Sequence, residues 1–316
     1  MICYFYIPMN GSTYRPGYIQ LHQSGELRRR GETLWELLRD CVLCPRECRV
    51  DRIAGGRGFC MATSKLRVAS FAPHFGEERP LVGVGGSGTI FFSHCNLGCV
   101  FCQNWDISHK GAGTDCKIDD LAGMMLELQE AGCHNINMVT PTHFSPHIVM
   151  ALDLAVSRGL RLPLVYNTCG WERTPVLELL DGVVDVYLAD FKYMDAGVAS
   201  DYSGGAQEYP RITRSALLEM NRQVGTAQPE HKGLVYRGLM IRHLVMPADA
   251  SGSMEAMRWI AGNLPADSYV NIMLQYRPAY RAHLFPEIDR YVSREEYAGV
   301  VDEARKCGLA NLDVAI

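Results

Sequence analysis

Three cysteines in one short stretch have the type and spacing that metal chemistry requires. The segment FFSHCNLGCVFCQNW (residues 91–105) places Cys95, Cys99 and Cys102 in a tight turn behind an apolar run. Thiolates are soft ligands that favour iron–sulfur clusters, zinc or copper(I). A closed zinc site takes a fourth ligand from nearby, and none follows in this turn. Three thiolates on a four-iron cluster leave one iron open, so we expect a cluster that binds a further ligand directly.

A second group of cysteines lies earlier in the chain and has the ligand count of a closed site. Cys41, Cys44, Cys48 and Cys60 are separated by two, three and eleven residues. The glycines within residues 55–58 allow the chain to turn back and deliver the last thiolate. Four thiolates suit either a zinc ion or a [4Fe-4S] cluster, and the spacing does not choose between them.

The elements that position the first group alternate between strand and helix. Helices are expected between the apolar runs, with an N-cap at Ser145 before Pro146 and a capping box formed by Ser293 and Glu296. Such alternation forms a parallel sheet with right-handed crossovers, and six units predict an α/β fold, a partial (β/α)6 TIM-like barrel. Active sites of such barrels lie where strands end, and the three-cysteine turn directly follows the first strand. The six runs that read as buried strands are residues 89–93, 136–140, 163–167, 184–190, 239–245 and 270–275.

Length and composition limit the class of protein. The 316 residues are 47% hydrophobic and 21% charged, as in folded globular proteins. We expect a cysteine-rich N-terminal extension over residues 1–80 and the barrel over residues 81–316. The net charge of −4 makes nucleic acid an unfavoured partner.

The location follows from the absence of sorting and spanning signals. The start MICYFYIPMN lacks the features of a signal peptide, and no run reaches the length of a membrane span. We therefore expect a cytoplasmic protein with no membrane partner, in which clustered cysteines bind metal instead of forming disulfides. Most of the scattered cysteines are expected to be small buried side chains; they are Cys3, Cys116, Cys133, Cys169 and Cys307.

At the three-cysteine turn the sequence resembles the radical S-adenosylmethionine (SAM) superfamily. The fingerprint CxxxCxxC with an aromatic residue before the last cysteine is met by CNLGCVFC with Phe101. The resemblance implies that Cys95, Cys99 and Cys102 hold a [4Fe-4S] cluster whose open iron chelates SAM. It also implies reductive cleavage of SAM to a 5′-deoxyadenosyl radical that abstracts hydrogen, with the cofactor carrying the radical chemistry and the protein positioning it.

Longer motifs resemble one branch of that superfamily, the iron–sulfur proteins related to pyruvate formate-lyase activating enzymes. The matching stretches are YNTCGW (166–171), VYLADFKYMD (186–195) and IRHLVMP (241–247). Enzymes of this type make a glycyl radical on a partner protein, which implies a glycyl radical enzyme or peptide as substrate and flavodoxin or ferredoxin as electron donor. The resemblance also favours iron–sulfur over zinc at the four-cysteine group, as an auxiliary cluster.

The resemblance assigns cofactor contacts to residues at the ends of the expected strands. Lys192, two residues after Asp190, would pair with the SAM carboxylate as a point charge. Relatives end the second strand with Gly-Gly-Glu, whereas this chain has Thr140, Pro141 and Thr142; backbone carbonyls of that turn can still accept hydrogen bonds. The expected cofactor-binding residues are Phe101, Thr140, Pro141, Asn167, Thr168, Asp190, Lys192, His243 and Gln275.

Several alternatives remain open on the sequence alone. His143 and His147 flank the second strand's turn and are expected to be ordinary hydrogen-bonding residues, with a catalytic role as the alternative. Cys169 is expected to be a turn residue, with a thiol role near the radical as the alternative. A radical SAM enzyme acting on a small molecule or on RNA is one alternative function. A metal-binding regulatory protein without turnover is the other.

Overall fold

The computed structural model describes residues 14–315 of the chain. Cys3 and the amino-terminal stretch considered above lie outside the described residues. Among residues 14–315, no helix is both long enough and apolar enough to cross a membrane. The eleven cysteines of this part of the chain are free thiols.

One nine-stranded sheet organises the fold, in the order β3-β1-β2-β4-β5-β6-β7-β8-β9. From β2 to β9 each neighbouring pair in that order is parallel, whereas β1 runs antiparallel to both β2 and β3. The strands are β1 (Leu66–His74), β2 (Ser87–Phe92), β3 (Thr114–Cys116), β4 (Ile136–Val139), β5 (Leu164–Thr168), β6 (Val186–Asp190), β7 (Gly238–Leu244), β8 (Tyr269–Met273) and β9 (Asn311–Val314).

The α/β class and the six expected strands are confirmed, since they correspond to β2 and β4 to β8. The sheet is open, with β3 and β9 at its edges, and a seventh strand, β9, extends the parallel order beyond six units. The TIM-like barrel therefore stays a prediction. Strand β1 joins the same sheet although it falls within residues 1–80, and the division at residue 80 also stays a prediction.

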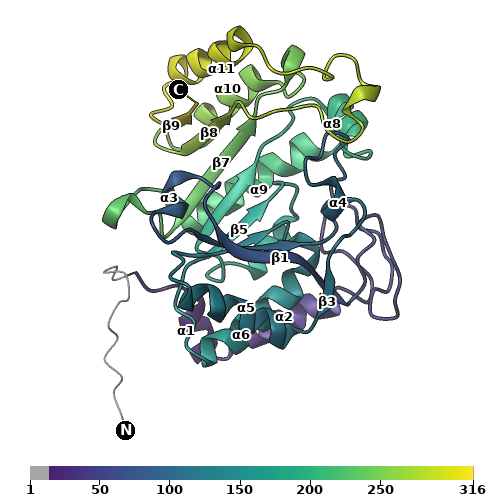
Figure 1. Cartoon of the computed structure of the whole chain (residues 1–316), viewed down its shortest axis with the longest axis vertical. Coiled ribbons are helices and arrows are strands. Elements are labelled where there is room, and N and C mark those ends of the chain that lie inside the picture. The colour runs from purple at the N-terminus through teal and green to yellow at the C-terminus, as the bar shows by residue number, and fades with distance from the viewer. Residues whose placement is uncertain (1–13, 316) are drawn as a thin grey trace.

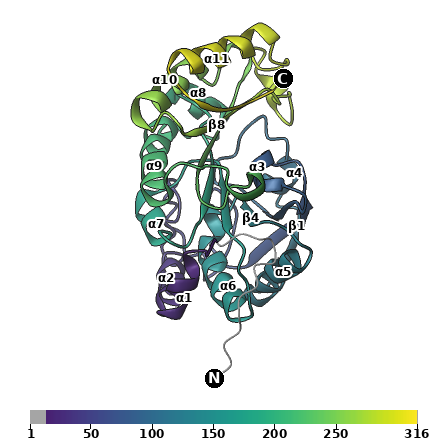
Figure 2. The same ribbon diagram turned by 90° about the vertical axis from the view of Figure 1, so that its left-hand side faces the viewer.

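Helices cover the sheet and gather at its two ends. Helices α10 and α11 lie at one end of the molecule, and α1, α2, α5 and α6 lie at the other (Figures 1 and 2). The helices are α1 (Tyr18–Gln23), α2 (Glu26–Glu36), α3 (Arg79–Val82), α4 (Trp105–Ser108), α5 (Ile118–Glu130), α6 (Ser145–Ser157), α7 (Thr174–Leu179), α8 (Ala196–Tyr202), α9 (Tyr209–Val224), α10 (Ser253–Asn263) and α11 (Arg294–Lys306). Short 3₁₀ turns are η1 (Thr142–Phe144), η2 (His231–Gly233), η3 (Pro247–Asp249) and η4 (Ala282–Leu284).

Side-chain capping was expected at the start of two of these helices. The capping box of α11 is confirmed: the Ser293 side chain accepts from the Glu296 backbone N–H, and Glu296 accepts from the Ser293 backbone N–H. The N-cap expected at Ser145 is wrong by one residue. Helix α6 already includes Ser145, Phe144 occupies the N-cap without a side-chain bond, and Pro146 fills the first turn.

The register of the parallel strands sets polar residues side by side at their carboxyl ends. Asp190 on β6 is paired with Arg242 on β7, and Arg242 is paired with Asn271 on β8. Apolar residues of the same strands, such as Met138 and Leu188, are fully buried. Because a parallel sheet is covered on both faces, functional side chains gather at its carboxyl edge, where the loops begin.

Candidate cysteine-bound cluster site

The three-cysteine turn leaves the carboxyl end of β2 and ends where α4 begins. Cys99 is buried, and Cys95 and Cys102 are mostly buried. Burial, with the charges of Cys99 and Cys102, raises the pKa of the Cys95 thiol to about 12. A metal that displaced the protons of the three thiols would gain three thiolate ligands.

Hydrogen-bond donors surround the three sulfurs. The backbone N–H of Leu97 donates to Cys95 Sγ at 3.4 Å, and Ser203 Oγ donates to Cys99 Sγ at 3.1 Å. Ser108 Oγ lies 3.1 Å from Cys102 Sγ. Hydrogen bonds to ligand sulfurs stabilise their negative charge and are one of the means by which proteins set the potential of a cluster. This donor set fits a [4Fe-4S] cluster.

The sulfurs do not form a preformed site for a single ion. Within residues 14–315, no group of three or more His, Cys, Asp or Glu side chains could hold a metal ion as placed. A tetrahedral zinc site with bonds of about 2.3 Å needs sulfurs about 3.8 Å apart. A cluster holds its thiolates further apart, because iron and sulfide lie between them.

The four-cysteine loop holds a second group of thiols. Burial raises the pKa of Cys44, and the charge of Cys60 raises it further. The loop closes on itself, because the Cys41 N–H donates to Val50 O at 3.0 Å and the Phe59 N–H donates to Cys48 Sγ at 3.4 Å. The four cysteines therefore lie within one closed loop.

A buried arginine indicates which charge a centre in the four-cysteine loop would carry. Arg52 is 1% exposed, and no carboxylate of the described chain pairs with it. Its Nη1 lies 3.9 Å from Cys41 Sγ, its Nη2 donates to Thr63 O at 2.8 Å, and its Nε has no partner among the described residues. A buried guanidinium requires a negative partner. Thiolates bound to a metal would provide one, so the residues fit an anionic four-thiolate centre of either metal.

Arg46 joins the two cysteine loops. Its guanidinium donates to the carbonyls of Asn96, Leu97, Ser203 and Gly204, at 3.0, 3.1, 3.1 and 2.6 Å. The same group stacks on the Phe59 ring at 3.6 Å. Asn96 and Leu97 lie inside the three-cysteine turn, and Arg46 lies inside the four-cysteine loop. The two loops are therefore packed directly against each other.

A charged network occupies the carboxyl ends of β5 to β8. Lys192 Nζ lies 2.6 Å from Asp190 Oδ2, and Arg242 Nε donates to Asp190 Oδ1 at 2.8 Å. Arg242 Nη2 also donates to Asn167 Oδ1 at 2.7 Å. Burial opposes ionisation of Asp190, but the charges of Arg242 and Lys192 outweigh it and lower its pKa. Burial raises the pKa of Cys99, and the positive charge of Lys192 opposes that rise.

Two further carboxyl groups reach this network from the segment after β1. Asn271 Nδ2 donates to Glu78 Oε1 at 3.0 Å, and Glu77 Oε2 lies 3.7 Å from Arg242 Nη1. Burial raises the pKa of Glu77 to about 7. Glu77, Glu78 and Arg242 were not among the residues expected from the sequence. An adjacent acidic pair next to a strand was the only available signal, and it is common on protein surfaces.

The ends of β4 and β5 meet at a buried carboxyl group. Thr142 Oγ1 donates to Glu172 Oε1 at 2.5 Å, and Thr168 Oγ1 donates to the same oxygen. Burial raises the pKa of Glu172 to about 7. Thr140 has φ of +58°, a conformation rare for a β-branched residue. Strain of this kind gathers at functional sites, and the position is one where the resembling family has glycine.

Three buried histidines form hydrogen bonds to other groups of the protein. His143 and His147 bind the carbonyls of Ser93 and Ser64, each at 2.8 Å. Burial lowers their pKa values to about 3 and about 4, so both are neutral. His243 uses both ring nitrogens, with the Phe191 carbonyl at 2.6 Å and the Ser253 hydroxyl at 2.8 Å, and burial lowers its pKa to about 4.

The remaining expected site residues lie around the cysteine turn and the strand ends. Phe101 is buried against the rings of Tyr193 and Tyr276, at centroid distances of 6.5 and 5.6 Å. Pro141 is buried after Thr140, whereas Gln275 is exposed, and its carbonyl accepts from Gln103 Nε2 at 3.2 Å.

Cys169 lies beside the three-cysteine turn. Its Sγ is 3.6 Å from Asn96 Oδ1, and that amide also donates through Nδ2 to Trp171 O at 3.3 Å. Burial raises the pKa of Cys169, and the charge of Cys95 raises it further. A fourth thiol is therefore close to the first three, which spacing along the chain could not show.

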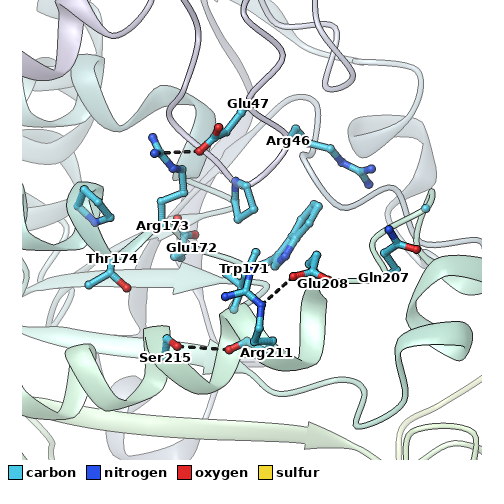
Figure 3. A pocket seen from close by; sticks show the side chains of 14 residues that line it. Arg46, Glu47, Trp171, Glu172, Arg173, Thr174, Gln207, Glu208, Arg211 and Ser215 are labelled. Carbon is cyan, nitrogen blue, oxygen red and sulfur yellow. Dashed lines mark hydrogen bonds and ion pairs between the residues drawn. The ribbon is translucent and has the colours of Figure 1, made fainter.

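A hollow of about 550 Å³ lies on the outer side of this region, next to Trp171. Figure 3 shows that two of its arginines, Arg173 and Arg211, are directed at carboxyl groups. Arg173 pairs with Glu47 at 2.8 Å, and Arg211 pairs with Glu208 at 2.7 Å. These two pairs are neutralised within the protein, whereas Arg46, which also lines the hollow, donates to backbone carbonyls.

Comparison with known proteins gives the family but no activity. No family model matches the chain. The crystal structure of Streptococcus suis SuiB aligns with a TM-score of 0.47 and 13% identity, over 71% of this chain and 47% of that one, so the chain spans less than half of that protein's length. The uncharacterized protein MJ0674 of Methanocaldococcus jannaschii is 33% identical over 283 residues, which are 86% of this chain and 76% of the relative. The chain belongs to the same protein family as MJ0674.

Proposed function

We propose that this protein is a radical SAM enzyme that binds a [4Fe-4S] cluster through Cys95, Cys99 and Cys102. The observation that carries the proposal is the set of three hydrogen-bonded thiols that follows β2 at the carboxyl edge of a parallel sheet. The CxxxCxxC spacing supports the same conclusion. When bound, the cluster and SAM would supply a 5′-deoxyadenosyl radical.

The residues at the strand ends have separable tasks in this proposal. Lys192 offers a positive charge to the SAM carboxylate and is oriented by Asp190. Asp190 in turn is fixed by Arg242, so a variant of Arg242 acts on Lys192 indirectly. Phe101, Tyr193 and Tyr276 form an aromatic wall that keeps water from the cysteine turn.

The finer proposal is an activating enzyme that takes hydrogen from a glycine of a partner protein, with a second [4Fe-4S] cluster at Cys41, Cys44, Cys48 and Cys60. The activase-like motifs support it, and the buried Arg52 supports an anionic centre at the second site. A small-molecule or RNA substrate is the alternative within the same chemistry. Zinc is the alternative metal at the four-cysteine site.

The experiment is anaerobic reconstitution with iron and sulfide, followed by SAM and dithionite. We expect 5′-deoxyadenosine and a SAM-induced change in the electron paramagnetic resonance (EPR) spectrum of the reduced cluster. Cys99→Ser should abolish both, whereas Cys307→Ser, outside both loops, should change neither. Iron content without any SAM-dependent product would contradict the enzymatic proposal and favour a non-catalytic metal protein. Deuterium transferred from a labelled glycine of a candidate partner into 5′-deoxyadenosine tests the activase proposal separately.

A further inference from the structure

A second hollow, of about 620 Å³, lies between the four-cysteine loop and the segment around His94. Four cationic side chains and one carboxylate line it: Arg57, Lys65, Arg67, Lys110 and Asp115. The chain as a whole has net charge −4. The hollow therefore has the opposite sign of charge to the rest of the molecule.

Most of this positive charge has no partner within the protein. Arg67 pairs with Asp115 at 2.6 Å. Arg57, Lys65 and Lys110 are exposed, and none of them forms an ion pair with any described residue. Lys110 Nζ lies 4.3 Å above the Trp105 ring, which holds it at the rim without neutralising it.

The hollow contacts both cysteine loops. Met61 and Ala62, which directly follow Cys60, line one side, and His94, which directly precedes Cys95, lines the other. Met61 is 46% exposed, and it lines the hollow together with the apolar side chains of Ile53 and Ala54. An exposed apolar centre with a charged rim is the anatomy of a protein–protein interface.

We propose that this cationic hollow is the docking surface for a small acidic one-electron carrier protein of the flavodoxin or ferredoxin class. The inference rests on the proposed function, which requires such a donor. On docking, the reduced carrier gives up one electron, which is accepted by a centre held in the cysteine loops; no bond forms or breaks in that step. The surface fits the task, because it borders both cysteine loops and, through Arg46, those loops contact each other.

An acidic protein fits better than nucleic acid. An extended polyanion would contact surface well beyond the hollow, and the negative net charge outside it would repel the phosphates. A compact acidic protein needs only a local patch of complementary charge. Such complementarity acts mainly on the rate of encounter and weakens with salt.

The test uses the reconstituted full chain and purified flavodoxin. We expect the double variant Lys65→Glu/Lys110→Glu to weaken flavodoxin binding and slow flavodoxin-driven reduction by about tenfold or more at low salt, with a smaller effect at high salt. Reduction by dithionite, a small reagent that needs no docking surface, should keep its wild-type rate. The matched control is Lys306→Glu at the end of α11, at the far end of the molecule (Figure 1), which should bind flavodoxin as the wild type does.

Each outcome decides the inference. Equal flavodoxin binding by the double variant and the wild type would overturn it, as would tighter binding of tRNA than of flavodoxin at the same residues. If the wild type formed no 5′-deoxyadenosine with dithionite, the proposed function would be refuted instead. The comparison of flavodoxin binding would still show whether the hollow is the docking surface. Iron content and circular dichroism of the variants confirm that the loops have folded.

Discussion

The buried carboxyl group of Glu172 gives the sharpest quantitative prediction. The change is Glu172→Gln, which keeps the shape of the side chain and leaves an oxygen to accept from Thr142 and Thr168. Burial raises the pKa of Glu172 from 4.5 to about 7 in the folded chain. The protonated acid is therefore favoured by folding, and its ionisation is a cost to the native state.

The sign and size follow from proton linkage. Between the unfolded pKa of 4.5 and the folded pKa of about 7, the native state binds more protons than the unfolded state, so stability falls as pH rises. A tenfold difference in proton affinity between the two states corresponds to about 1.4 kcal/mol, which sets a full cost of about 3 kcal/mol above the folded pKa. The glutamine carries no charge. Its stability relative to wild type should therefore rise by about 2.5 kcal/mol between about pH 5 and about pH 8.

Urea unfolding of both proteins across this pH range measures the difference. Glu77 and Asp185 have raised pKa values for the same reason, but they are unchanged in the variant and cancel in the comparison. The control is Glu178→Gln on α7, which removes an exposed carboxyl group instead of a buried one. A pH-independent difference for Glu172→Gln would refute the argument that this carboxyl group is protonated by burial.

Three further substitutions test other parts of the structure. Cys169→Ser should retain the iron of the three-cysteine site and the SAM-induced EPR change; loss of either would show that Cys169 is a fourth ligand. Arg46→Met removes four charge-assisted hydrogen bonds and should lower the free energy of unfolding by about 3 kcal/mol. Both loops should also lose iron faster in air. A variant as stable as wild type would contradict the contact between the loops. Arg242→Met leaves the carboxyl groups near it without their main countercharge and should cost about 3–5 kcal/mol in thermal or urea unfolding, whereas a cost below about 1 kcal/mol would mean that the network is well solvated.

Local patterns in the sequence were sufficient to predict the six strands and the start of α11. Each of the six expected strands is a buried apolar run, and burial on both faces makes such runs continuous. Ser293 and Glu296 could be predicted because both halves of a capping box lie within three residues. The N-cap predicted at Ser145 was wrong, because the 3₁₀ turn Thr142–Phe144 runs directly into α6. Ser145 therefore already has helical backbone angles.

The contacts between distant segments could not be read from spacing. Glu77 and Arg242 are 165 positions apart, and four strands separate β1 from β7 in the sheet. Their contact depends on the path of the segment that follows β1, which the spacing of residues does not reveal. Cys169 approaches Cys95 because β5 and β2 end at the same edge of the sheet. The roles assigned to Lys192, Asn167 and the other cofactor residues stay predictions until SAM binding is measured.

The four hydrogen bonds from Arg46 to backbone carbonyl oxygens limit how far this protein can be truncated from its amino terminus. A version that started after the four-cysteine loop would strip the 96–97 peptide groups of their guanidinium and uncover the Gly98 backbone that Phe59 now shields. Removing the first sixty residues would therefore damage the centre of the molecule, and the smallest stable fragment must retain both sulfur-rich segments.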